Sequence, residues 1–185
     1  MIDRRDFEAS FRYAPFGFKI LPTAHSFWVF PDCTFLDNSN YFQYTITPYG
    51  KDVERNIPNK EEVVIPAFKK IGSDKAIWRY DPIFINEKYT WDYHIRAFTK
   101  IAEMLEGYTN KAVMSYVDSY RTVDLSPLHI QPLTIAQQKE LAEQLSEIAA
   151  AHGITLTACA EDLGLPYSCC IDGKMFGINK PKDRN

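Results

Sequence analysis

Four short runs of apolar and aromatic residues recur along the chain, and helix-like sequence separates each run from the next. The runs are YFQYTIT (41–47), AIWRYDPI (76–83), AVMSYVDSY (112–120) and ITLTACAED (154–162). Tyr44, Tyr80 and Tyr116 follow one another at intervals of 36 residues (80−44 and 116−80), about the length of one strand–helix unit in a β/α barrel. This alternation predicts an α/β fold with parallel strands joined by right-handed crossovers.

Helix signals fill the segments between these runs. Thr134 and Gln137 form a T-x-x-Q capping box at the start of the clearest predicted helix. Thr90 and Gly107 are suited to begin and end a second helix, whose apolar residues recur every three or four positions. A third helix is predicted over about 61–71, where an internal proline should shorten or kink it.

The chain of 185 residues has the length of one domain. Residues 1–40 show no regular period apart from a short strand expected at 26–30, so we interpret them as a poorly patterned N-terminal segment. Residues 41–185 are predicted to form a partial β/α barrel of the TIM-barrel type, with about four to five parallel strands. Since eight strands are needed to close such a barrel, we expect an open sheet with exposed edges, through which copies of the chain could self-associate.

Composition and charge limit the expected partners. The net charge is −3 and no basic stripe is present, so we expect no nucleic-acid partner. No run of 18 apolar residues occurs, and the charged start MIDRRDFEAS is unlike a signal peptide. We therefore expect a cytoplasmic protein that acts on an unknown small-molecule substrate away from the membrane. In that compartment the cysteines should stay reduced.

Charged residues stand at or just after the ends of three predicted strands. They are Arg79, Asp81, Asp118 and Glu161. Because the carboxyl ends of parallel strands share one rim, we expect these side chains to converge there as catalytic residues. Three carboxylates can hold a divalent metal or move protons, and a guanidinium can bind a substrate carboxylate or phosphate. The alternative is a purely structural ion-pair network, in which Arg79 neutralises Asp81 and Asp118.

Other polar residues are expected to have structural roles. His94 borders the buried face of its predicted helix, which favours a satisfied core histidine over a ligand. Tyr44 is expected to pack in the core. The loop over 119–132 shows no element of its own and is a candidate substrate-facing loop. The cysteine spacings lack a zinc-binding pattern, so buried reduced thiols are the simpler interpretation.

Several long strings resemble one known family. YFQYTITPYGKDVE, IWRYDPIFINEKYTWDYHIRAF, TACAED and CCIDG are similar to the bacterial family called domain of unknown function 1848, over roughly residues 41–183. The resemblance implies a β/α-barrel protein whose complete members continue into a cysteine cluster of the iron–sulfur or radical S-adenosylmethionine kind. It also implies Cys159 and Cys170 as cofactor-binding ligands if a cluster forms.

The resemblance further implies that this chain is a truncated copy. The family's Ser-Arg-Arg-Thr-Asp type opening and its cysteine-rich end have no counterpart here, and residues 1–40 are divergent. Three functional hypotheses stay open. The complete form is an iron–sulfur barrel enzyme, with no cluster expected in this chain. Otherwise the protein is a divalent-metal or acid–base barrel enzyme without a cluster, or it is a non-catalytic fragment.

Overall fold

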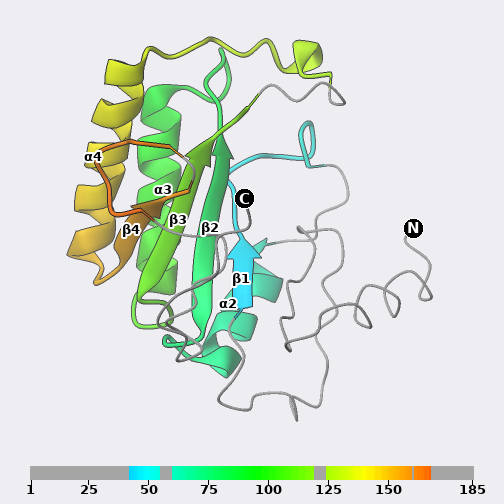
Figure 1. Cartoon of the computed structure of the whole chain (residues 1–185). Coiled ribbons are helices and arrows are strands. Elements are labelled where there is room, and N and C mark those ends of the chain that lie inside the picture. Colours follow the sequence, from blue (N-terminus) through cyan, green and yellow to red (C-terminus); the bar gives the residue numbers. More distant parts are fainter. Residues whose placement is uncertain (1–41, 55–59, 119–123, 160, 168–185) are drawn as a thin grey trace, which may run out of the picture.

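The computed structural model describes residues 42–54, 60–118, 124–159 and 161–167. Four parallel strands form one sheet with the spatial order β1-β2-β3-β4 (Figure 1). They are β1 (Phe42–Thr45), β2 (Ala76–Ile83), β3 (Lys111–Tyr116) and β4 (Thr155–Ala158). The predicted α/β class and parallel pairing are confirmed. The described sheet is open, and the barrel-like closure is not seen; the expected strand at 26–30 and the segment 1–40 lie outside the described residues.

Three α-helices connect the strands. They are α2 (Lys60–Ile71), α3 (Trp91–Leu105) and α4 (Ile135–Ala151). The two predicted N-caps are confirmed: Thr90 accepts a hydrogen bond from the Tyr93 backbone, and Thr134 and Gln137 form both bonds of the capping box. Pro66 does not shorten α2, which covers its whole predicted range.

The loop before α4 was expected to have no element, and this was wrong in its second half. A single turn of 3-10 helix, η1 (Ser126–Leu128), interrupts it. The Asp124 carboxylate accepts hydrogen bonds from both the backbone N–H and the hydroxyl of Ser126, at 3.0 and 2.7 Å. An aspartate that bonds the backbone two residues later favours a turn, and Pro127 is suited to the first helical positions.

All three helices pack on one face of the sheet. Alternate strand residues face them and form one buried cluster with residues of α2, α3 and α4. At its centre the Trp78 and Phe98 rings are stacked with centroids 4.5 Å apart. Because side chains alternate along a strand, the residues between these point to the opposite side of the sheet, which we call the second face. It carries Gln43, Thr45, Ile77, Arg79, Asp81, Val113, Ser115, Thr157 and Cys159.

The 36-residue repeat corresponds to a stagger between strands. The residue numbers of paired residues in β1 and β2 differ by 34 (76−42), and those in β2 and β3 differ by the same amount (111−77). The spacing of the tyrosines is therefore two residues longer than the spacing of paired residues. Each repeated tyrosine therefore lies two residues further toward the carboxyl end than the one before. All three are buried, and the Tyr44 ring lies 5.2 Å from that of Phe68, which confirms its predicted packing role.

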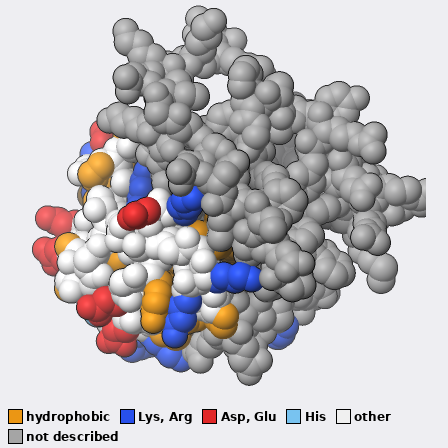
Figure 2. Space-filling model, turned by 90° about the horizontal axis from the view of Figure 1, so that it is seen from below, with side chains coloured by type: hydrophobic (Ala, Val, Ile, Leu, Met, Phe, Trp, Pro, Cys, Tyr) orange, Lys and Arg blue, Asp and Glu red, His pale blue; other side chains and the backbone are white. Residues whose placement is uncertain are grey.

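The outer edge of β4 is partly covered. The Ala158 backbone N–H donates to the Pro166 carbonyl at 3.1 Å, and Tyr167 forms a parallel bridge with Ala158. The end of the molecule where the strands begin presents interspersed basic and acidic side chains over its described surface (Figure 2). Among the helices of the described residues, none has both the length and the apolar character needed to cross a bilayer.

Candidate functional site at the carboxyl ends of the strands

Arg79 and Asp81 form an ion pair on the second face at the end of β2. The Arg79 Nε donates to Asp81 Oδ2 at 3.0 Å, and Nη2 contacts the same oxygen. Residues two apart on a strand point the same way, so the strand itself brings the two side chains together. The predicted proximity of this arginine and this carboxylate is therefore present in the structure.

Gln43 on the neighbouring strand completes this group. Its Oε1 accepts a hydrogen bond from Arg79 Nη1 at 3.2 Å. Sequence reasoning missed Gln43, although a signal was available. It directly precedes Tyr44, whose ring faces the helices, so the alternation of the strand sends Gln43 to the face that holds Arg79.

Burial shifts the protonation of Asp81. Its side chain is 11% exposed. Removal from water raises the pKa of the Asp81 carboxyl above its ordinary value, and the positive charge and hydrogen bonds of Arg79 offset only part of this rise. A carboxyl group with a raised pKa beside a guanidinium can hold or release a proton closer to neutral pH than a surface aspartate can.

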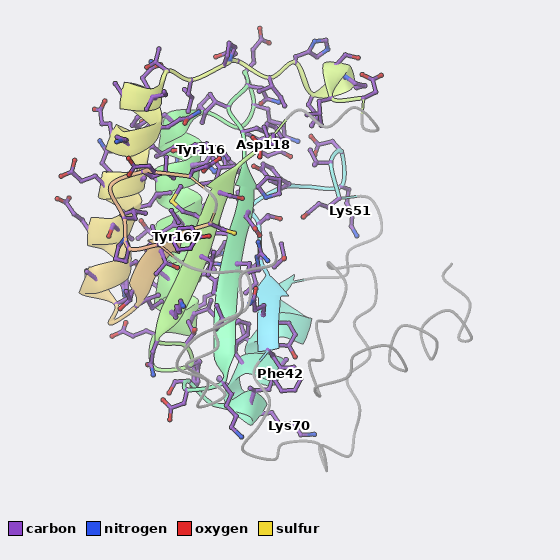
Figure 3. All side chains as sticks on the ribbon, in the orientation of Figure 1. Phe42, Lys51, Lys70, Tyr116, Asp118 and Tyr167 are labelled. Carbon is purple, nitrogen blue, oxygen red and sulfur yellow. The ribbon has the colours of Figure 1, made fainter. Side chains whose placement is uncertain are left out.

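Glu161 and Asp118 form the second part of the site. Both carboxylate oxygens of Glu161 accept from the Tyr116 backbone N–H, at 3.2 and 3.1 Å, which ties the segment after β4 to the end of β3. Partial burial raises the pKa of Glu161, and the negative charge of Asp118 raises it further against the hydrogen bond from Tyr116. Asp118 itself is exposed beyond β3, at the same end of the sheet as Tyr116 and Lys51 (Figure 3).

The four predicted residues thus lie at one end of the sheet as two pairs. Arg79 is paired with Asp81, and Asp118 acts electrostatically on Glu161. The ion pair that the structural alternative expects between Arg79 and Asp81 is formed. For Asp118, the interaction found among the described residues is repulsion from Glu161.

A set of tyrosines holds the loop after β1 against the loop after β2. The Tyr89 hydroxyl donates to Asp52 at 2.8 Å and accepts from the Gly50 N–H at 2.9 Å, while Lys88 pairs with the same Asp52 oxygen at 2.9 Å. Tyr49 donates to the Pro82 carbonyl at 2.8 Å. These bonds tie the loop after β1 to the end of β2 and to the loop that follows it, on the carboxyl side of the sheet.

His94 has the structural role that its sequence position predicts. It is fully buried, and both ring nitrogens are hydrogen-bonded, Nδ1 to the Tyr80 hydroxyl and Nε2 to the Phe84 carbonyl. Burial lowers the pKa of His94 to about 4, so the ring is neutral at physiological pH.

The predicted cofactor ligands are only partly described. Cys159 is a buried cysteine on the second face, packed with Ile77 and Val113. Cys170 lies outside the described residues. In the described ranges, no group of three or more histidine, cysteine, aspartate or glutamate side chains is arranged to hold a metal ion. The predicted three-carboxylate metal site is therefore not formed by these residues as they stand.

Residues 27–183 match the family described as "Domain of unknown function (DUF1848)". No curated protein matches the chain.

Proposed function

Since the chain belongs to the DUF1848 family, whose description names no reaction, we propose a function from the geometry of the site. The protein is an enzyme of the β/α-barrel type that performs acid–base chemistry on a small molecule at the carboxyl end of its sheet. The observation that carries this proposal is a pair of carboxyl groups with raised pKa, Asp81 and Glu161, at the ends of β2 and β4. General acids and bases work best when their pKa lies near the working pH.

The strand order supports the barrel type. In doubly wound sheets the order reverses at a switch point and helices cover both faces. Here the order is sequential and α2, α3 and α4 contribute to one cluster on one face. A sequential strand order with the helices on one face supports a sector of a β/α barrel, in which the second face would correspond to the barrel interior.

Each charged residue has a distinct part in such chemistry. Asp81, held by Arg79, exchanges a proton with the substrate. Glu161 is held in place by the Tyr116 N–H and serves as the partner acid or base. Burial raises the pKa of Glu161, and the negative charge of Asp118 adds to this rise. Two carboxyl groups in different surroundings are a recurrent solution for acid and base roles in one site.

Binding of small molecules tests this proposal. A panel of small carboxylic acids, amines, sugars and phosphate esters is screened by thermal shift against the full chain, and hits are measured by calorimetry. Asp81→Asn and Glu161→Gln should each weaken the binding of a hit at least tenfold. Glu147→Gln, an exposed glutamate on α4, is the matched control and should bind normally. Equal binding by all four proteins would reject the proposal.

A second candidate is the iron–sulfur form that the resemblance implies. One observation favours it: Cys159 is a buried cysteine on the same face as Arg79, two residues before Glu161. Iron–sulfur clusters are usually held by four cysteine thiolates, and the described residues supply one, so these residues alone do not fit a cluster and no step is assigned to it. Anaerobic reconstitution followed by iron and sulfide analysis, with Cys159→Ser and Cys170→Ser beside the unaltered chain, decides this candidate.

A further inference from the structure

We infer that Asp81 gives and takes its proton through Oδ1, and that Arg79 is the positioning residue that reserves Oδ2. This inference rests on the proposed function, because it names the reacting atom of the same acid–base group. It concerns the hydrogen-bond geometry of one carboxyl group and can be tested without knowledge of the substrate.

Both contacts from Arg79 go to one oxygen. Nε lies 3.0 Å from Oδ2, and Nη2 also bonds Oδ2. A guanidinium more often grips the two carboxylate oxygens separately, with one N–H for each. Here Oδ2 already accepts two N–H groups. A proton on Oδ2 would compete with those donors, so the acid form carries its proton on Oδ1.

Oδ1 is the accessible oxygen of the pair. Within the described residues, no hydrogen bond or ion pair reaches it. None of the buried side-chain oxygens in the described part of the chain lacks a partner. An unpartnered Oδ1 therefore keeps contact with solvent, although the Asp81 side chain as a whole is 11% exposed. A substrate atom on the second face can reach Oδ1 without disturbing Arg79.

Gln43, on the neighbouring strand β1, also holds the guanidinium in place. Its Oε1 accepts from Nη1 at 3.2 Å, while Nε and Nη2 face Asp81. The guanidinium is planar and rigid, so bonds to three of its nitrogens fix its orientation. Gln43 is uncharged and therefore holds Arg79 without competing for its positive charge. The Arg79 guanidinium acts only as a hydrogen-bond donor and a positive charge.

The proton then leaves and returns through a single atom, Oδ1. The bond between Oδ1 and hydrogen breaks as a basic oxygen or nitrogen of the substrate takes the proton, and the Asp81 carboxylate left behind is stabilised by Arg79. The reverse step restores the acid. Glu161 and Asp118, the other charged residues of the candidate site, do not contribute to the protonation shift of Asp81.

Infrared difference spectroscopy across a pH titration tests the assignment on the full chain, with aspartate labelled with 13C at the carboxyl. Asp81→Asn identifies the band of the protonated Asp81 carbonyl. If Oδ2 is the carbonyl oxygen, its two hydrogen bonds place the band at low wavenumber. Arg79→Met removes both bonds and should move the band to higher wavenumber. Arg96→Met, an exposed arginine on α3, should leave it in place.

Two further variants keep the test decisive. Arg79→Lys retains the positive charge but cannot donate two N–H groups to Oδ2 in the same way. The band should therefore move even if the pKa of Asp81 stays close to that in the unaltered chain. Gln43→Leu keeps both Arg79 and Asp81, and should shift the band by less than Arg79→Met does. This variant provides a test if Arg79→Met fails to fold. A band unmoved in folded Arg79→Lys and Gln43→Leu overturns the inference. A shifted band together with unchanged ligand binding by Asp81→Asn upholds this proton position and rejects the proposed function instead.

Discussion

The Tyr80 hydroxyl lies 2.9 Å from His94 Nδ1 inside the core, a bond that joins β2 to α3. On the other side of the ring, Nε2 lies 3.0 Å from the Phe84 carbonyl oxygen. A carbonyl can only accept, so Nε2 carries the hydrogen and Nδ1 accepts from the tyrosine. The neutral Nε2–H tautomer is thus the one that satisfies every partner.

This neutral histidine makes stability depend on pH. The pKa of His94 is about 4 in the folded protein, below its ordinary value of 6.5, so the unfolded chain takes up the proton first. The contribution of His94 is complete above pH 6.5 and is lost as the pH falls from 6.5 to 4, by roughly 3 kcal/mol in total. Urea unfolding at several pH values should show this loss.

A direct titration provides the control for that experiment, because the raised pKa values of Asp81 and Glu161 also make stability depend on pH. Nitrogen-15 NMR of the His94 ring should show Nε2 protonated and Nδ1 unprotonated down to about pH 5. A ring that titrates near pH 6.5 would contradict the burial argument.

Tyr80→Phe should destabilise the fold without repacking it. The ring remains, but His94 Nδ1 loses its donor inside the core, which costs about 1–3 kcal/mol. Tyr108→Phe, at a half-buried tyrosine whose ring is covered by Lys69, is the matched control and should change stability by less than about 0.5 kcal/mol. Chemical denaturation at pH 7.5 compares the two, and equal losses would count against the buried bond.

Thr134→Ala should weaken the start of α4. The threonine side chain accepts from the Gln137 N–H at 3.2 Å, and the Gln137 side chain accepts from the Thr134 N–H at 2.9 Å. Loss of such a cap costs about 1 kcal/mol. Thr134→Ser keeps the hydroxyl and should retain most of the stability in the same denaturation experiment. If the serine variant is as unstable as the alanine variant, the cap is not the cause.

Glu161→Gln should stabilise the protein at neutral pH. The folded pKa of Glu161 lies above its ordinary value of 4.5, so ionisation above that pKa weakens the fold. Glutamine removes the charge near Asp118 and can still accept from the Tyr116 N–H. Because the carboxyl is partly solvated, the gain is roughly 0.5 kcal/mol at pH 7.5 and vanishes below pH 4.

Glu147→Gln supplies the baseline for this comparison. A loss of stability in Glu161→Gln at pH 7.5 would mean that the charged form of Glu161 supports the structure. If Glu161→Gln is more stable but binds the ligand more weakly, Glu161 is a residue that supports activity at the expense of stability.

The strands and helix starts could be predicted from sequence because their signals are local. The run 76–83 coincides with β2, and the caps at Thr90 and Thr134 begin α3 and α4 as expected. The signal for η1 was the aspartate two residues before Ser126, and it was overlooked. The pairing of Arg79 with Asp81 also follows from a local rule, the two-residue period of a strand.

The rest of the site depends on contacts between distant segments. Gln43 reaches Arg79 only through the register of β1 and β2, and Glu161 reaches the Tyr116 N–H only through the path of the chain after β4. A single sequence shows neither register nor path. The repeat of 36 residues is the sequence feature that comes closest to predicting the register. Even so, paired residues of neighbouring strands are 34 positions apart, two fewer than the repeat.

The one-sided helix layer also affects how such a protein can change over time. Substitutions at positions such as Trp78 and Met114 disturb the packing that keeps the chain folded. Substitutions at Gln43, Arg79 or Asp81 alter the other side of the same strands and spare that packing. The residues proposed to act on a substrate are thereby separate from the residues that hold the fold together.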